Sequence, residues 1–157
     1  PQKTADHVSS MDLYATILGF LGLSGEIDEA QIPSRDFSHL LRGEEGHWDN
    51  EIFIEQEETR AFRTAGWSYV KRFRGSPNYP LSDELYDTLK DPDERTNLSG
   101  SAEHQDIETS FSNKLDAFFA KYADPKFNTW TGGTVKSNTS RPWLWKDAWG
   151  DNWKPSP

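Results

Sequence analysis

The longest regular pattern in the sequence is an apolar stripe that runs from Ala102 to Tyr122. Its apolar side chains recur at helical spacing, with charged residues between them: Ile107, Phe111, Leu115, Phe118, Phe119 and Tyr122. This spacing predicts one amphipathic helix, which Asp124 and Pro125 end. Such a helix is stable only when its apolar side covers another element, so the preceding residues are expected to supply that surface.

Four short segments ahead of this helix have the composition of strands. Ile52–Ile54, a compact apolar run, is the first of them, and Glu84–Asp87 is the last. Between them, Arg60–Arg63 and Trp67–Phe73 predict a hairpin that turns at Ala65-Gly66. Strands followed by one long helix indicate an α+β fold, in which a small antiparallel sheet of about four strands packs against the helix.

The first part of the chain predicts a second, shorter helix. Ser9 precedes Asp12 by three positions, a spacing like that of a capping box. The apolar residues of the predicted helix face are Leu13, Ile17 and Leu21. Gly22 or Gly25 is expected to end the helix, because glycine adopts the left-handed conformation found at helix C-termini.

These patterns divide the chain into four stretches. Residues 1–24 hold the first helix, 25–50 form a connecting segment, 51–124 hold the predicted sheet and long helix, and 125–157 form an irregular, Trp-rich extension. Hydrophobic residues make up 34% of the chain and the mean hydropathy is -0.86. We therefore expect a thin core and an exposed apolar face.

The charge of the chain disfavours some kinds of partner. The formal net charge is -9 and the pI is about 4.9. Phosphate backbones and anionic membrane surfaces are bound mainly through Lys and Arg, so neither nucleic acid nor a membrane is expected as a partner. The sequence contains no cysteine, which rules out disulfides, thiolate metal ligands and thiol catalysis by its residues.

Four motifs follow one another along the chain: Val8–Leu23, Phe37–Gly43, Arg60–Lys71 and Glu84–Leu98. In this order they resemble the C-terminal half of the sulfatase family, within the alkaline phosphatase superfamily. The first motif departs from the family pattern at Ala15, where proline is usual.

The last motif is the most specific of the four. It consists of Glu84, Leu85, Tyr86, Asp87, Asp91, Pro92, Glu94, Asn97 and Leu98. Its residue types suit structural roles rather than catalysis. Leu85 and Tyr86 are expected on opposite faces of a strand. Asp91-Pro92 is expected to form a rigid turn, and Asn97 to bond backbone groups near it.

The resemblance implies a fold and an activity for a larger parent protein. Residues 1–24 would end an alkaline-phosphatase-like α/β catalytic domain, and the sheet and long helix would form its C-terminal subdomain. The parent would hydrolyse a sulfate ester on a carbohydrate, in the periplasm or outside the cell, with a formylglycine nucleophile and a calcium or magnesium ion. The N-terminal catalytic domain would be the main partner of this chain, which alone would be inactive while it supports the core and lines the substrate cleft.

One segment resembles the family's nucleophile signature, C/S-x-P-S-R. It is Gln31-Ile32-Pro33-Ser34-Arg35, and Gln31 stands where a Cys or Ser must be converted to an aldehyde. The segment also follows the first helix, whereas the family's signature lies far before that helix. We therefore interpret it as non-catalytic, and expect no catalytic residue and no metal ligand in this chain.

Five side chains are candidates for substrate contacts: Arg60, Arg63, His39, Trp143 and Trp145. An arginine fork suits a sulfate or a sugar carboxylate, and aromatic faces suit sugar rings. Each candidate has a structural alternative, which the residue types favour. The arginines would pair with Glu55, Glu57 or Glu58, the histidine would lie at the surface or half-buried, and the tryptophans would pack on the catalytic domain.

Two other functions fit the same sequence. The Trp-rich extension would make the chain a non-catalytic carbohydrate-binding module if its aromatic rings bind sugar. Within the same superfamily, the parent would alternatively be a phosphoester or phosphonate ester hydrolase. The nucleophile discriminates these enzymes, because C/S-x-P-S-R indicates formylglycine and a lone Thr or Ser indicates phosphoryl transfer.

Overall fold

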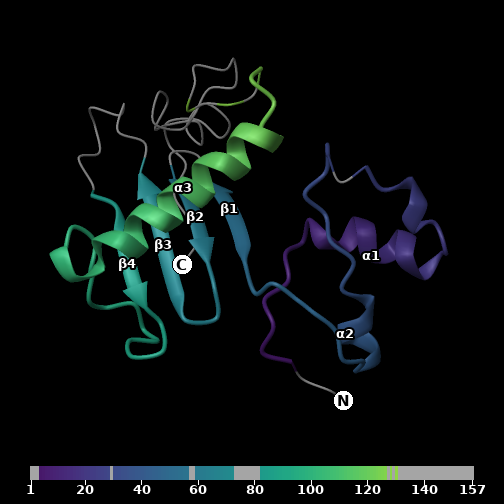
Figure 1. The fold of residues 1–157 in the computed structure, drawn as a ribbon, viewed down its shortest axis with the longest axis horizontal. Coiled ribbons are helices and arrows are strands. Elements are labelled where there is room, and N and C mark those ends of the chain that lie inside the picture. Colours follow the sequence, from purple (N-terminus) through teal and green to yellow (C-terminus); the bar gives the residue numbers. More distant parts are fainter. Residues whose placement is uncertain are drawn as a thin grey trace, which may run out of the picture.

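The computed structural model describes residues 4–28, 30–56, 59–72, 82–126, 128 and 130. They form two units that lie side by side (Figure 1). The N-terminal unit, which ends at residue 50, holds helices α1 (Asp12–Phe20) and α2 (Ser38–Arg42) and the 3-10 turn η1 (Ser24–Glu26). The sheet unit begins at residue 51 and holds the strands and the long helix. No helix among the described residues is long and apolar enough to cross a membrane.

The sheet is antiparallel throughout, and its four strands lie in chain order: β1 (Ile52–Gln56), β2 (Thr59–Arg63), β3 (Trp67–Arg72) and β4 (Glu84–Asp87). The backbone N of Thr64 donates to the carbonyl of Trp67 at 2.9 Å, which closes the predicted hairpin. In the strand register, Phe62 pairs with Tyr69, and Tyr69 pairs with Leu85. These three large side chains therefore form a row on one face of the sheet.

Helix α3 (Gln105–Tyr122) crosses that face diagonally (Figure 1). The buried core joins the sheet to the helix and consists of Phe62, Tyr69, Leu85, Leu115 and Phe119. Phe53 and Phe118 add a stacked pair with ring centroids 3.9 Å apart. The α+β architecture predicted from the sequence is thus confirmed. The helix begins later than predicted because Ala102–His104 forms the 3-10 turn η2.

Both ends of α1 agree with the sequence pattern. Gly22 has a φ of 73°. The backbone N of Leu23 donates to the carbonyl of Leu18 at 2.8 Å, the bond that defines a Schellman motif. At the other end, the backbone N of Ser9 donates to the carboxylate of Asp12 at 2.9 Å, which is one half of the predicted capping box.

Helix α1 has its polar and small residues on the inside. Asp12, Ala15 and Thr16 are buried. The large apolar side chains of the helix and its flanks are exposed: Val8, Met11, Leu13, Tyr14, Ile17, Phe20, Leu21 and Leu23. A contiguous exposed apolar surface is typical of an interaction site. The exposed apolar face expected from the composition therefore lies on the N-terminal unit, and we call these eight residues the α1 apolar face.

Candidate functional site

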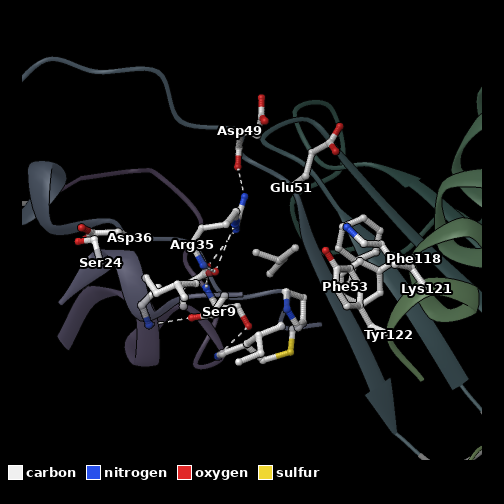
Figure 2. Close-up of a pocket in the computed structure, with 18 residues that line it drawn as sticks. Ser9, Ser24, Arg35, Asp36, Asp49, Glu51, Phe53, Phe118, Lys121 and Tyr122 are labelled. Carbon is white, nitrogen blue, oxygen red and sulfur yellow. Dashed lines mark hydrogen bonds and ion pairs between the residues drawn. The ribbon is translucent and has the colours of Figure 1, made fainter. Parts of the chain in front are cut away.

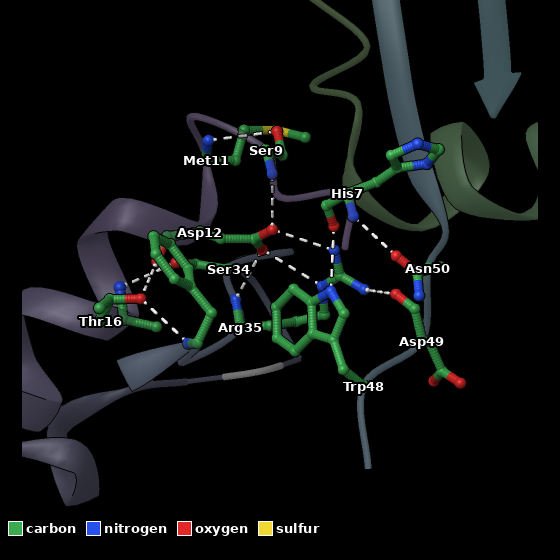
Figure 3. A network of polar contacts seen from close by, with 12 residues as sticks. His7, Ser9, Met11, Asp12, Thr16, Ser34, Arg35, Trp48, Asp49 and Asn50 are labelled. Atoms are coloured by element: carbon green, nitrogen blue, oxygen red, sulfur yellow. Dashed lines mark hydrogen bonds and ion pairs between the residues drawn. The ribbon is translucent and has the colours of Figure 1, made fainter. Parts of the chain in front are cut away.

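A buried carboxylate organises the N-terminal unit. Asp12 is only 1% exposed, and its carboxylate accepts a hydrogen bond from the backbone N of Ser9. Arg35 supplies three more donors, namely its backbone N at 3.0 Å, Nε at 3.2 Å and Nη2 at 3.0 Å (Figure 3). Four N–H groups therefore compensate one buried charge, and they join the start of α1 to the loop before α2.

Arg35 is itself fixed by further contacts. Its Nη1 donates to the carbonyl of Asp49 at 2.8 Å, and its guanidinium carbon lies 4.3 Å from the ring centroid of Trp48. The Trp48 indole in turn donates to the carbonyl of His7 at 3.0 Å (Figure 3). A guanidinium that is bonded at its edge and stacked on its face has a defined orientation. We call these contacts, together with Asp12, the Asp12–Arg35 network.

The segment that resembles a nucleophile signature packs against α1. The hydroxyl of Ser34 accepts from the backbone N of Ala15 at 2.9 Å. The side-chain amide of Gln31 donates to the carboxylate of Asp28 at 2.7 Å. Because Arg35 belongs to the Asp12–Arg35 network, three of the five residues in this segment have structural partners. The likeness to the signature thus has a packing explanation in this fold.

A cleft of about 530 Å³ lies between the two units (Figure 2). Its aromatic wall comes from β1 and α3 and consists of Phe53, Phe118 and Tyr122. The wall from the N-terminal unit is mixed: it includes the polar residues Ser9, Asp12, Arg35, Asp36 and Asp49 and the apolar residues Met11, Ile27 and Ile32. A cavity of this size with a mixed lining lies within the range of small-molecule sites.

The charges of the cleft disfavour a sulfate group. Its described lining holds four carboxylates and two cations: Asp12, Asp36, Asp49 and Glu51 against Arg35 and Lys121. The stronger hydrogen-bonding cation, Arg35, already donates to Asp12 and to a backbone carbonyl. Asp12 is paired with Arg35 and Glu51 with Lys114, so Asp36 and Asp49 supply the remaining negative charge, which is unfavourable for a sulfate at short range.

The described residues do not fit the metal or the nucleophile that the resemblance implies. Among them, no group of three or more His, Asp or Glu side chains is placed to hold a metal ion. Gln31 cannot replace a formylglycine precursor, and the sequence has no cysteine.

His39 lies in α2 against the ring of Trp48, with centroids 5.9 Å apart. Gly46 packs on the imidazole so closely that a Cβ there would lie 2.8 Å from Cδ2. The imidazole is half-buried, as expected if His39 has a structural role. A substrate contact by His39 stays a prediction. Trp143 and Trp145 lie outside the described residues.

The two candidate arginines lie on opposite faces of β2. The Arg60 side chain is 7% exposed and lies on the α3 side, where Nε donates to Glu55 at 2.8 Å. Arg63 lies on the other side, and its Nη1 is 2.9 Å from the carboxylate of Glu94. Arg60 thus pairs with one of the glutamates that the structural alternative names, whereas Arg63 pairs with Glu94 instead. Substrate contact stays a prediction for both.

The motif that begins at Glu84 forms a compact turn after β4. Leu85 is buried in the core and Tyr86 is half-buried on the opposite face, as predicted. The side-chain carbonyl of Asn97 accepts from the backbone N of Leu85 at 3.0 Å and of Ser99 at 2.9 Å. Its amide donates to the carbonyl of Asp83 at 3.1 Å. One carboxamide therefore ties the turn back to the strand.

The Asp91 carboxylate stabilises the same turn. It accepts from the backbone N of Arg95 at 2.8 Å and of Thr96 at 2.7 Å. Glu94, just before Arg95, has a φ of 52°, a conformation that is uncommon outside glycine. The left-handed residue directs the chain back toward β2, where the Glu94 carboxylate meets Arg63. The motif thus builds a fixed loop, which agrees with the structural roles predicted for it.

Tyr86 and Glu84 form a coupled pair in this motif. Burial and the hydrogen bond to Glu84 raise the pKa of Tyr86 to about 12. Burial acts to raise the pKa of Glu84, but hydrogen bonds from Arg72 and Tyr86 bring it below its ordinary value. The phenol donates to the carboxylate at 2.8 Å, so the pair is most stable when the phenol is protonated.

The raised pKa of Tyr86 predicts a loss of stability at high pH. An unfolded tyrosine releases its proton near pH 10, whereas folded Tyr86 keeps it until about pH 12. The stability that this proton contributes is therefore complete below pH 10 and is lost as pH rises through about 12. Tyr86→Phe is expected to remove this part of the loss, measured by urea denaturation at several pH values. The exposed Tyr14→Phe is the control, and a pH profile unchanged by Tyr86→Phe would contradict the assignment.

The Asp12–Arg35 network is the part of the site that sequence reasoning missed. One signal for it exists, since Asp12, Ala15 and Thr16 recur at helical spacing and form a polar and small stripe. The apolar stripe beside it is more conspicuous, although the structure exposes that stripe. Nothing in the spacing indicates that Arg35 and Trp48 would reach this position.

No protein-family model matches the sequence, and no curated protein matches it. Solved structures do match. One is a phosphonate monoester hydrolase of Agrobacterium radiobacter, with a TM-score of 0.56 and 21% identity over 73% of this chain and 25% of that one. A second is a 2-O GAG sulfatase, with a TM-score of 0.53 and 25% identity over 73% of this chain and 25% of that one.

A third match was solved in complex with its substrate, D-glucosamine-2-N,6-O-disulfate. Its TM-score is 0.54 and its identity is 20%, over 73% of this chain and 24% of that one. This chain therefore spans about a quarter of the length of the structures that it matches. The matched region is their C-terminal portion, so the chain has the fold of the C-terminal part of sulfatase-like enzymes of the alkaline phosphatase superfamily.

Proposed function

We propose that this chain is the C-terminal subdomain of a sulfatase-like hydrolase whose catalytic domain cleaves a sulfate ester on a carbohydrate. The observation that carries the proposal is the match of 73% of this chain to 25% of a 2-O GAG sulfatase. In this role the sheet unit supports the catalytic domain and borders its substrate cleft. The chemistry belongs to residues outside the described part of this chain.

The α1 apolar face supports the same division of roles. Ile17 and Leu21 are 56% and 65% exposed, although aliphatic side chains gain free energy when they are buried. In the matched enzymes, about three quarters of the chain lies outside the matched region. The catalytic domain is therefore the partner that we expect to cover this face.

In this proposal the cofactors belong to the catalytic domain. A calcium or magnesium ion requires several oxygen ligands converging on one point, and formylglycine requires a Cys or Ser precursor. We propose that the catalytic domain holds both groups and also receives the sulfate. The excess of carboxylates in the cleft of this chain supports that placement.

An activity assay tests the proposal by comparing the 157-residue chain with the longer protein that contains it. The longer protein is expected to hydrolyse an aryl sulfate. Replacing the Cys or Ser of its C/S-x-P-S-R signature by Ala should lower turnover by at least about 10³-fold. The 157-residue chain should show no turnover. Turnover by that chain, or a longer protein that lacks the signature, would overturn the proposal.

A phosphonate ester hydrolase is the second candidate. The match to the phosphonate monoester hydrolase has a TM-score of 0.56, as high as the matches to sulfatases. Assaying the longer protein with an aryl phosphonate monoester beside an aryl sulfate that has the same aryl leaving group discriminates the two, because the preferred substrate reveals whether phosphorus or sulfur is attacked. The carbohydrate-binding module also stays a prediction, which Trp143→Ala and Trp145→Ala test through loss of sulfated polysaccharide binding.

A further inference from the structure

Two aromatic rings contact the guanidinium group of Arg60. Its guanidinium carbon lies 4.0 Å from the ring centroid of Phe119 and 4.6 Å from that of Trp130. At its edge, Nε donates to Glu55 and Nη2 donates to the side-chain carbonyl of Asn128 at 2.9 Å. A planar cation that contacts two aromatic rings and a carboxylate is well compensated for burial.

The partners of Arg60 come from three different parts of the sheet unit. Glu55 is in β1, Phe119 is in α3, and Asn128 and Trp130 follow α3. The Asn128 carbonyl also accepts from the backbone N of Trp130 at 3.1 Å. The bond from Arg60 to Asn128 thus spans 68 positions of sequence and holds Asn128, beyond the end of α3, against the sheet.

We propose that Arg60 is a positioning residue that anchors the start of the Trp-rich extension to the sheet. Asn128 and Trp130 are then held beside β2 and α3, instead of following a free end of α3. Lysine cannot replace arginine here, because an ammonium group has no planar faces for two rings and no fork for two oxygens. The inference is independent of the reaction that the parent catalyses.

Hydrogen–deuterium exchange of the 157-residue chain tests the anchor, with Arg60→Met, Arg60→Lys and Trp130→Leu as variants. All three are expected to raise the exchange rate in residues 123–130 by about tenfold, while residues 105–122 of α3 keep their rate. Arg63→Met is the matched control, since Arg63 is an ion-paired arginine of the same strand and should leave residues 123–130 unchanged.

Two results would overturn the proposal. One is unchanged exchange in residues 123–130 when Arg60 is replaced by Lys or Met. The other is an equal increase throughout the sheet unit, which would make Arg60 a contributor to global stability alone. Trp130→Leu keeps the test decisive if Arg60→Met does not fold, because Trp130 lies outside the hydrophobic core cluster.

Discussion

Asp12→Ala is expected to lower the free energy of unfolding of the N-terminal unit by about 3–5 kcal/mol, the range for breaking a buried ion pair. The substitution removes the one acceptor shared by the backbone N of Ser9 and three N–H groups of Arg35. Those donors would face a cavity in a region where Asp12 is 1% exposed. Chemical denaturation with amide exchange of residues 12–42 as the local readout measures the loss.

The matched control is Asp93→Ala. Asp93 also pairs with an arginine, Arg95, but the two side chains are 67% and 78% exposed, and such a pair contributes only about 0–1 kcal/mol. Asp12→Asn keeps the shape of the side chain and should lose less than Asp12→Ala. If Asp12→Ala lost no more than Asp93→Ala, the Asp12–Arg35 network would not be the support of this unit.

Phe62→Ala should lower the free energy of unfolding of the sheet unit by about 3–5 kcal/mol, because it leaves a cavity at the centre of the core. Phe62 is fully buried, and its ring centroid lies 5.1 Å from that of Phe53 and 5.0 Å from that of Phe111. The same substitution therefore weakens the contacts of β1, β2 and α3 together. Urea denaturation followed by circular dichroism measures the effect.

Leu89→Ala provides the comparison for Phe62→Ala. Leu89 is 78% exposed in the turn after β4, so its replacement is expected to change stability by no more than about 0.5 kcal/mol. A similar small effect for Phe62→Ala would show that the row of large residues between sheet and helix is not the core of this unit.

The sheet unit was predictable from the sequence because its signals are local and periodic. The stripe that includes Phe111, Leu115 and Phe119 has one strong period, and it is the side that packs on the sheet. The motif from Glu84 to Leu98 likewise acts through contacts between residues close in sequence, such as Leu85 with Asn97. Local patterns of this kind require no knowledge of the rest of the protein.

The N-terminal unit was less predictable, since its inside is defined by contacts between distant residues. Asp12 meets Arg35 across 23 positions, and Arg35 stacks on Trp48, which is not visible in any spacing. The apolar stripe through Ile17 predicted the helix correctly but pointed to the face that is exposed in this chain. A rule that places apolar residues inside holds only when the whole set of packing partners is present.

The α1 apolar face also affects how the chain behaves in solution. The chain has a net charge of -9, so its molecules repel one another at low ionic strength. This repulsion offsets the attraction between exposed aliphatic surfaces. Added salt shortens the range of the repulsion to about 3 Å at 1 M, while the attraction between apolar surfaces persists. Self-association of the separate chain should therefore increase with ionic strength, and colloidal stability becomes a simple indicator of whether α1 is covered.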